Sequence, residues 1–436
     1  MRDDACFRLY LSRRKFIRMS VAGTTLGLLP GACLFPLTQP AGKQPVEGAK
    51  GRSVIVIQLT GGNDILNTVI PYQDPAYFRA RPTLNSVAKK ARPISDNLAF
   101  HPALDPLREL FQDGQLAILQ GVGYPQSSRD HQQAIRDWYT ALPGDTVERT
   151  GWIGRACDIL NQALPSEVHA LFVGTIPLPQ ALVGRSAVVP RIRDANNVNW
   201  EPLPAGDWEI SSGEPPDEGT APLTAEAQDL LRHLRQTATQ AQRVAKRVQA
   251  AVEKVAPQLD AARFELERRL QLIASLIDAE VGVRFFFTDF GGPEPGGFDT
   301  HANQLDNHHA LLTELAQGIA SFAHHTEKLG IADRVLLMTF SEFGRTLAEN
   351  GRHGTDHGAA TSLFVFGKAV QGGLVGKHPS LYQLDQGGLI HHTDFRAVYK
   401  SLLEDWLGVP AEPVLGPVPG PVPLFVKEEY RAGRAS

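Results

Sequence analysis

Aspartate and histidine residues recur in short, glycine-flanked segments of this chain. The motif GTDHG places Asp356 and His357 side by side between two glycines, and GGFDTHANQ carries Asp299 and His301. Asp64 ends the segment SVIVIQLTGGND. Carboxylate oxygens and imidazole nitrogens bind Zn²⁺, and Mn²⁺ or Mg²⁺ where oxygen ligands predominate. Together these residues predict a divalent-cation site that would polarise an ester and activate a nucleophile or water.

Each of these residues alone also has a structural explanation. Asp64 could cap the turn that follows it, Asp299 could accept backbone amides of its glycine-rich loop, and His357 could be a buried core histidine. All of them follow predicted strands, however, and ligands of a doubly wound sheet bind beyond the carboxyl ends of its strands. Their common position favours one site, in which the flanking glycines let the backbone turn sharply and would give the ion access.

The elements that must position these residues alternate along the chain. Continuous apolar runs predict buried strands, and amphipathic segments between them predict helices. Residues 223–282, in which Ala, Gln, Leu and Arg dominate, predict a helical insertion packed on the sheet. The alternation predicts an α/β fold whose mainly parallel sheet is covered on both sides. The strands are expected at 53–64, 116–122, 168–174, 283–291, 335–342 and 362–367, and the helices at 103–114, 129–142 and 306–330.

The N-terminus has the features of an export signal. Residues 1–33 contain the pair Arg13 and Arg14 followed by a moderately apolar stretch, which resembles a twin-arginine signal peptide. An amphipathic N-terminal helix is the alternative. We expect residues 34–52 to be a linker, the twin-arginine translocase to be a partner during export, and the mature protein to be periplasmic or extracellular. Cys33 follows small residues and is a candidate for a lipid anchor.

The composition argues against several classes of function. The chain of 436 residues is 42% hydrophobic and 21% charged, with a formal net charge of −4. It therefore lacks the basic surface expected of a nucleic-acid-binding protein. After the signal, no apolar stretch is long enough to span a bilayer. The turn TGGND lacks the spacing of a dinucleotide fingerprint, which argues against an oxidoreductase. Cys157 is the one cysteine that follows Cys33, so we expect no disulfide within the mature chain.

Seven motifs occur in a fixed order from about residue 53 to residue 408: VIVIQLTGGNDILNTVIP, HPALDPLRELFQDGQLAILQGVGYP, GWIGR, GGFDTHANQ, SEFGRT, GTDHG and TDFRAVYKSLLEDWLG. In this order they resemble the family DUF1501, which is placed in the alkaline phosphatase/sulfatase superfamily. The resemblance implies a three-layer α/β/α sandwich over residues 53–425, with the helical insertion at 223–282. It also implies metals beside a nucleophile.

The resemblance assigns roles to individual residues. One or two metal ions would be held by Asp64, Asp299, His301, Asp356, His357 and His392. The catalytic residues would be Ser128, His131 and Arg345. Similar proteins have a serine directly before the histidine of GVGYPQSSRDHQQA, where this chain has Asp130. Ser128, at a predicted helix N-terminus, is therefore the candidate nucleophile, although Ser128 or Asp130 could instead cap that helix. Arg345 could clamp an oxyanion or form an internal ion pair with Glu342.

The sequence thus predicts an exported, metal-dependent hydrolase of phosphate or sulfate esters, acting on a small-molecule or polymer substrate. The attacking group would be Ser128 or water. The alternative is a non-catalytic exported protein of the same fold that binds a metal or a partner without turnover. Asp130, in place of the serine of similar proteins, supports that alternative, and the helical segment 223–282 would offer the partner surface.

Overall fold

The computed structural model describes residues 51–164, 168–193, 239, 246, 248–253, 262–293 and 296–426. Internal contacts divide the chain into Met1–Gln44 and Pro45–Ser436, and all described residues lie in the second unit. The predicted signal peptide, Cys33 and most of the linker therefore lie outside the described residues, as does much of the segment 223–282. No helix in the described part of the chain is long and apolar enough to cross a membrane.

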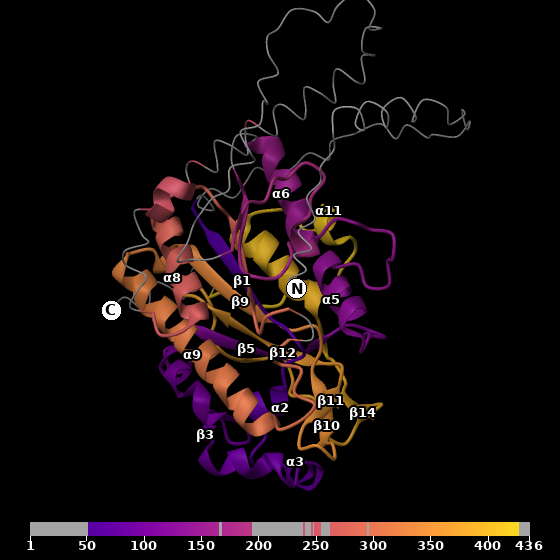
Figure 1. Ribbon diagram of the computed structural model, residues 1–436. Helices are drawn as coiled ribbons and strands as arrows, with labels where there is room; N and C mark the ends of the chain where they lie inside the picture. Colours follow the sequence, from indigo (N-terminus) through magenta and orange to yellow (C-terminus); the bar gives the residue numbers. More distant parts are fainter. Residues whose placement is uncertain are drawn as a thin grey trace, which may run out of the picture. The chain divides into compact units, whose positions relative to one another are not determined.

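Within the described residues, a nine-stranded sheet forms the centre of the second unit, in the order β13-β5-β12-β9-β1-β8-β6-β7 with β16 beside β5 (Figure 1). β12 is antiparallel to β5 and β9, whereas the other paired strands of this sheet are parallel. The mainly parallel sheet predicted from the sequence is confirmed. The strands are β1 Ser53–Leu59, β5 Leu116–Gly123, β6 Ala170–Val173, β7 Arg191–Ile192, β8 Phe285–Phe290, β9 Val335–Phe340, β12 Thr361–Phe366, β13 Gly373–Val375 and β16 Thr393–Asp394.

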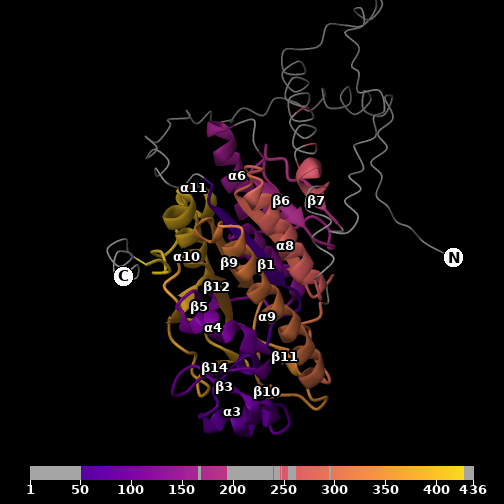
Figure 2. The ribbon, with the colours of Figure 1, turned by 90° about the vertical axis from the view of Figure 1, so that its left-hand side faces the viewer.

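The central strands of the sheet are buried on both faces because they are apolar along most of their length. In β1, Val54 and Val56 enter one hydrophobic core, whereas Ile55 and Ile57 enter the other, as alternation along a strand requires. Helices α8 (Glu265–Asp278) and α9 (Gln304–Lys328) cover the face of Ile55. Figure 2 shows both helices in front of β1 and β9. The opposite face is covered by α5 (His131–Thr140), α6 (Trp152–Ala163), α10 (Phe395–Lys400) and α11 (Glu412–Leu415). The three layers confirm the predicted α/β/α fold.

Two small sheets and several short helices follow the carboxyl ends of the central strands. One sheet has the order β11-β10-β15-β14 and the other β2-β4-β3. They contribute to a third, smaller hydrophobic cluster that includes Leu66, Tyr77 and Leu347. The elements are α2 Ile65–Thr68, β2 Val69–Ile70, α3 Pro75–Ala80, η2 Leu84–Lys90, β3 Arg92–Pro93, β4 Ala99–Phe100, β10 Arg345–Glu349, β11 Thr355–His357, β14 Leu384–Asp385 and β15 Gly388–Leu389.

The predicted helices are present, with one difference. Residues 103–114 form two short elements, the 3-10 helix η3 (Pro102–Leu107) and α4 (Arg108–Gln112). Pro106 lies inside η3 and cannot donate the backbone hydrogen bond that a continuous helix needs. The remaining elements are η4 Gln180–Leu182, η6 Ala332–Arg334 and the π-helix η7 Ser401–Leu407.

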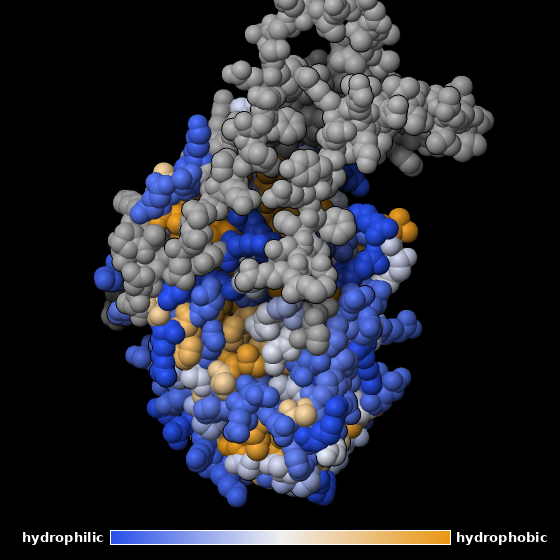
Figure 3. Space-filling view, viewed as in Figure 1, coloured by the Kyte–Doolittle hydropathy of each residue, from blue (hydrophilic) through white to orange (hydrophobic). Residues whose placement is uncertain are grey.

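The described surface seen from the side of Figure 1 is mainly polar. Figure 3 shows hydrophilic residues over most of one face, with hydrophobic residues in small separate areas. Most large apolar side chains of the described residues instead lie in the three cores. The buried polar side chains are therefore the features that need explanation, and many of them gather beyond the carboxyl ends of β1, β8 and β9.

Candidate metal centre

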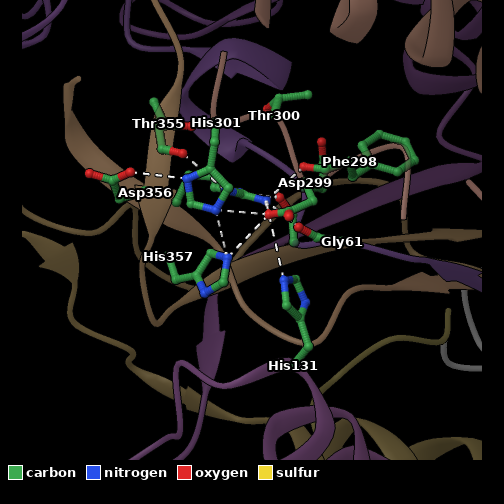
Figure 4. A network of polar contacts seen from close by, with 12 residues as sticks. Gly61, His131, Phe298, Asp299, Thr300, His301, Thr355, Asp356 and His357 are labelled. Carbon is green, nitrogen blue, oxygen red and sulfur yellow. Dashed lines mark hydrogen bonds and ion pairs between the residues drawn. The ribbon is translucent and has the colours of Figure 1, made fainter. Parts of the chain in front are cut away.

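Three histidines and one aspartate meet at this end of the central sheet (Figure 4). Ligand atoms of His131, Asp299 and His357 all lie within 4.8 Å of one another. The Nε2 atoms of His131 and His357 are 3.5 and 3.1 Å from Oδ1 of Asp299. His301 completes the group, because its Nε2 lies 3.1 Å from the same oxygen and 2.9 Å from Nε2 of His357. These four residues are called the histidine cluster below.

Three separate segments bring the histidine cluster together. His131 is the first residue of α5, which follows β5. Asp299 and His301 lie in the loop between β8 and α9, and His357 ends β11. The antiparallel pairing of β11 with β10 sets His357 opposite Arg345. The tertiary fold therefore builds the site from residues that lie far apart in the sequence.

The two glycines of the GTDHG motif allow backbones to pass close to one another. A Cβ atom on Gly354 would lie 2.2 Å from the carbonyl carbon of His301, and one on Gly358 would lie 2.6 Å from the carbonyl carbon of Arg345. A larger residue at position 354 would push the chain away from the loop that carries His301, and one at position 358 would push it away from the backbone of Arg345. This close packing is a structural reason why glycines flank Asp356 and His357.

Two histidines of the cluster are oriented by carboxylates. Nδ1 of His131 lies 3.0 Å from Oε1 of Glu342, and Nδ1 of His301 lies 3.0 Å from Oδ1 of Asp356. An ionised carboxylate can only accept a hydrogen bond, so each Nδ1 donates and each Nε2 keeps a lone pair when the imidazole is neutral. Carboxylates placed behind imidazoles in this way orient the histidine ligands of metal sites.

The third histidine is fixed in the same tautomer by a backbone carbonyl. Nδ1 of His357 lies 2.6 Å from the carbonyl oxygen of Arg129, which can only accept. Burial, together with the nearby charge of Arg345, lowers the pKa of His357 despite the hydrogen bond to the carbonyl of Arg129. The imidazole is therefore neutral near pH 7 and has one proton. Its Nε2 therefore turns a lone pair toward Oδ1 of Asp299, at 3.1 Å. A cation between or beside these two electron-rich atoms would relieve their repulsion.

A buried arginine holds Asp299 in place. Nη2 of Arg345 donates to Oδ1 of Asp299 at 2.6 Å. Burial favours the neutral acid, but the hydrogen bond and charge of Arg345 outweigh it, so the pKa of Asp299 is lowered and the carboxylate is ionised. The same guanidinium also donates to the backbone carbonyls of Gly61, Gly62, Phe298 and Thr355.

These contacts bear on the two roles that the sequence suggests for Arg345, an oxyanion clamp and an ion pair with Glu342. Its side chain is 0% exposed and occupied by protein acceptors, so it positions Asp299 and does not face a substrate. The expected ion pair with Glu342 is also absent from the described contacts of Arg345. Glu342 instead accepts from His131 and from the backbone N–H of Gly61, at 2.8 Å.

Asp64 lies outside the histidine cluster. Its carboxylate accepts from Nη1 and Nη2 of Arg81 at 2.6 and 2.9 Å, and also from the side-chain amide of Gln304. Its Oδ1 further accepts from the backbone N–H of Leu66 at 3.2 Å, which caps α2. Burial opposes ionisation, yet Arg81 keeps the pKa of Asp64 below its usual value. The structure therefore places Asp64 in a buried ion pair with Arg81 and does not bring it to the histidine cluster.

Ser128 and His392 are not part of the cluster. Oγ of Ser128 accepts from the backbone N–H of Asp130 at 3.1 Å. Asp130 itself caps α5, since its Oδ1 accepts from the N–H of Gln133 at 3.0 Å. Of the two capping candidates, Asp130 is therefore the cap. His392 is an exposed residue, and its backbone N–H donates to the carbonyl oxygen of Gly121 at 2.7 Å.

The structure places two of the predicted site residues differently from the roles that the sequence suggests. His131 was expected among the catalytic residues, but its Nε2 points into the cluster. Asp356 was expected among the ligands, but its carboxylate lies behind His301, on the side away from Asp299. Sequence reasoning did not identify the role of Glu342 behind His131. The signal that could have identified Glu342 is its position two residues after the end of β9, because Asp299 likewise lies in the loop after a strand of the central sheet.

Comparison with known proteins places the chain in a family but gives no function. The family model described as "Protein of unknown function (DUF1501)" matches residues 51–403. No curated protein matches the chain.

Several solved structures are distantly similar to the chain. The lipoteichoic acid synthase LtaP from Listeria monocytogenes has 10% identity and a TM-score of 0.38, with 83% of this chain and 73% of that one covered. A protein in the alkaline phosphatase superfamily from Vibrio parahaemolyticus has 11% identity and a TM-score of 0.36, with 84% and 71% covered. The alkaline phosphatase from the Antarctic bacterium TAB5 has 9% identity and a TM-score of 0.33, with 73% and 92% covered. Similarities this distant carry no argument about function, which has to come from the site itself.

Proposed function

Because the chain belongs to the DUF1501 family, whose function is unknown, we propose a function from the geometry of its own residues. The protein binds a divalent cation and hydrolyses phosphate or sulfate esters. The cation is held by the four residues of the histidine cluster, which are His131, Asp299, His301 and His357. Asp64 and His392 are left out of this ligand set, because Asp64 is paired with Arg81 and His392 lies outside the cluster.

One observation carries the proposal: the Nε2 atoms of three histidines converge on a single carboxylate oxygen, at 3.1 to 3.5 Å. Two nitrogens bound tetrahedrally to one zinc ion at about 2.1 Å lie about 3.4 Å apart, so the spacing in the cluster is close to that of a ligand set. Imidazole with one carboxylate suits Zn²⁺, and Mn²⁺ is a second candidate. The residues present therefore fit a divalent cation.

Each residue behind the cluster has a defined task. Glu342, Asp356 and the carbonyl of Arg129 hold the three Nδ1 protons, so that the Nε2 lone pairs are available to a metal. Arg345 keeps Asp299 ionised and fixed. A bound divalent cation would act as a Lewis acid toward an ester oxygen and lower the pKa of water.

Ser128 is the proposed attacking group, with water as the alternative. Ser128 directly precedes Arg129, whose backbone carbonyl contacts His357 of the cluster. Its Oγ accepts one hydrogen bond, from Asp130, and can still donate its own proton. Ser128→Ala separates the two cases. Loss of turnover with metal binding intact supports attack by the serine, and full turnover supports attack by water.

We also propose that the protein is exported through the twin-arginine pathway and acts in the periplasm or outside the cell. The basis is the pair Arg13 and Arg14 ahead of an apolar stretch, in residues that the structure does not describe. Replacing both arginines by lysine should keep the protein in the cytoplasmic fraction. Replacing Cys33 by serine should leave export unchanged, and would release the protein from the membrane fraction if this cysteine carries a lipid.

The test of the proposed function uses the full-length protein and generic substrates. Hydrolysis of p-nitrophenyl phosphate and p-nitrophenyl sulfate is measured with Zn²⁺, Mn²⁺ or Mg²⁺, before and after chelation. We expect activity that a chelator abolishes, and that His357→Ala abolishes as well. His324→Ala, at an exposed position of α9, is the matched control and should match the wild type.

The outcome also separates the two interpretations of the sequence. Stable metal binding without turnover on any ester would favour the non-catalytic, metal-binding protein. Absence of both binding and turnover in the wild type would contradict the proposal.

A further inference from the structure

The turn between β10 and β11 contains a side chain with contacts on both sides of a proposed ligand. We infer that Asn350 is a positioning residue that holds His301 in the histidine cluster. It acts on the backbone of His301 and, through Asp356, on its imidazole ring. The inference rests on the proposed function only in that it takes the cluster to bind a metal.

The side-chain amide of Asn350 makes two hydrogen bonds toward the cluster. Its Nδ2 donates to the carbonyl oxygen of His301 at 3.1 Å and to Oδ1 of Asp356 at 3.0 Å. That same Oδ1 accepts from Nδ1 of His301, at 3.0 Å. Asn350 thus fixes the main chain of His301 and the carboxylate that orients its ring.

The carbonyl oxygen of the same side chain has a separate task. Oδ1 of Asn350 accepts from the backbone N–H groups of Arg352 and Gly354, at 2.9 and 3.2 Å. These two bonds close the turn between β10 and β11. The amide nitrogen therefore serves the proposed ligand and the carbonyl oxygen serves the turn, so a substitution can remove one function and keep the other.

His301 needs such support more than the other two histidines. Its side chain is 28% exposed, against 17% for His131 and 22% for His357. The carboxylate behind it is also the more exposed of the two, because Asp356 is 59% exposed whereas Glu342 is fully buried. Packing and the backbone N–H of Gly61 hold Glu342, whereas the exposed carboxylate of Asp356 is held by its hydrogen bonds with Asn350 and with His301 itself, so the bond from Asn350 is the one that fixes it independently of the histidine.

Asn350→Asp is the substitution that isolates this role. It keeps an oxygen for the turn and replaces the donating amide by a second oxygen, which would face Asp356 and the carbonyl of His301. Changes of this kind behind a metal ligand weaken metal affinity by about 10- to 100-fold. We expect that loss for Zn²⁺ and Co²⁺ titrated into metal-free, full-length protein. The visible spectrum of bound Co²⁺, which reports the ligand set, should change as well.

Two further variants control for charge and for folding. The double variant that combines Asn350→Asp with Asp356→Asn again places a donor opposite an acceptor. It should recover part of the lost metal affinity. Asn307→Asp adds the same charge at an exposed position of α9 and should bind Co²⁺ like the wild type. The thermal unfolding of metal-free Asn350→Asp should stay close to that of this control, because the turn keeps its acceptor.

The results distinguish this inference from the proposed function. A wild type that binds no metal contradicts the proposed function. A wild type that binds metal, with Asn350→Asp equal to it in affinity and Co²⁺ spectrum, overturns the role of Asn350 alone. If Asn350→Asp does not fold, the variants Asn350→Ala, Asp356→Ala and their combination decide. If the double variant loses less metal affinity than the sum of the two single losses, Asn350 acts through Asp356. If the losses are additive, action through Asp356 is refuted.

Discussion

Removing Arg81 should destabilise the protein strongly, because it would leave a carboxylate alone in the interior. The side chains of Arg81 and Asp64 are both 0% exposed, and their closest atoms are 2.6 Å apart. In an Arg81→Leu variant, the donors that remain to Asp64 are the amide of Gln304 and the backbone N–H of Leu66. Breaking a buried ion pair by removing one partner costs about 3–5 kcal/mol, so the free energy of unfolding should fall by that amount.

The reverse substitution, Asp64→Asn, should cost less. Arg81 would still donate to the backbone carbonyls of Thr346 and Leu347 and to Oδ1 of Asn67. We expect a loss of about 3 kcal/mol, the lower end of the range for a buried ion pair that loses one partner, because the charge of Arg81 keeps these three neutral acceptors. Because the two side chains contact one another, the double variant with Arg81→Leu and Asp64→Asn should lose less free energy of unfolding than the sum of the two single losses.

Urea unfolding of the full-length variants, followed by tryptophan fluorescence, measures these free energies. Arg79→Leu is the matched control, since Arg79 is exposed on α3 and its replacement should change stability by about 0.5 kcal/mol or less. Metal content is measured in parallel. An Arg81→Leu variant as stable as the control would refute the buried ion pair. A folded Asp64→Asn variant that loses a metal ion would show that Asp64 is a ligand after all.

Three further predictions concern other parts of the fold. Burial lowers the pKa of His308 to about 4, whereas an unfolded chain has a histidine pKa of about 6.5. The unfolded state therefore binds a proton that the native state excludes between these values, and stability should fall by roughly 3 kcal/mol as the pH drops from 6.5 to 4, measured by urea unfolding. Gly354→Ala should cost about 1–3 kcal/mol and weaken metal binding, because its Cβ would meet the backbone of His301. Gly351→Ala, with nothing within 4 Å, is its control. Cys157 is free and buried, and burial raises its pKa, so it should react with a thiol reagent only on unfolding.

The main strands and the end of the sheet that carries the site could be predicted from the sequence. Runs such as 53–59 and 335–340 are mostly apolar and buried throughout, which is typical of strands covered on both faces. The rule that ligands gather beyond the carboxyl ends of strands then placed Asp299, His301 and His357 near one another, as the structure has them.

The individual roles of these polar residues, as proposed ligand, positioning residue or ion-pair partner, could not be predicted from the sequence. Asp64 follows a strand just as Asp299 does, and only the tertiary fold brings Arg81 to one and Arg345 to the other. Nothing local in the sequence distinguishes a histidine that faces the cluster from a carboxylate that stands behind it. The role of Asn350 depends on a turn that returns to the loop of His301, which no local pattern reports.

The most direct test of the metal centre is the metal-to-protein ratio of purified full-length protein, measured by mass spectrometry of the elements after equilibration with Zn²⁺ and with Mn²⁺ and removal of the excess. We predict at least one ion per chain in the wild type and in His324→Ala, and a clear loss of that ion in Asp299→Ala. A wild type that retains neither metal, or a folded Asp299→Ala variant that retains the full amount, would contradict a centre built around this carboxylate.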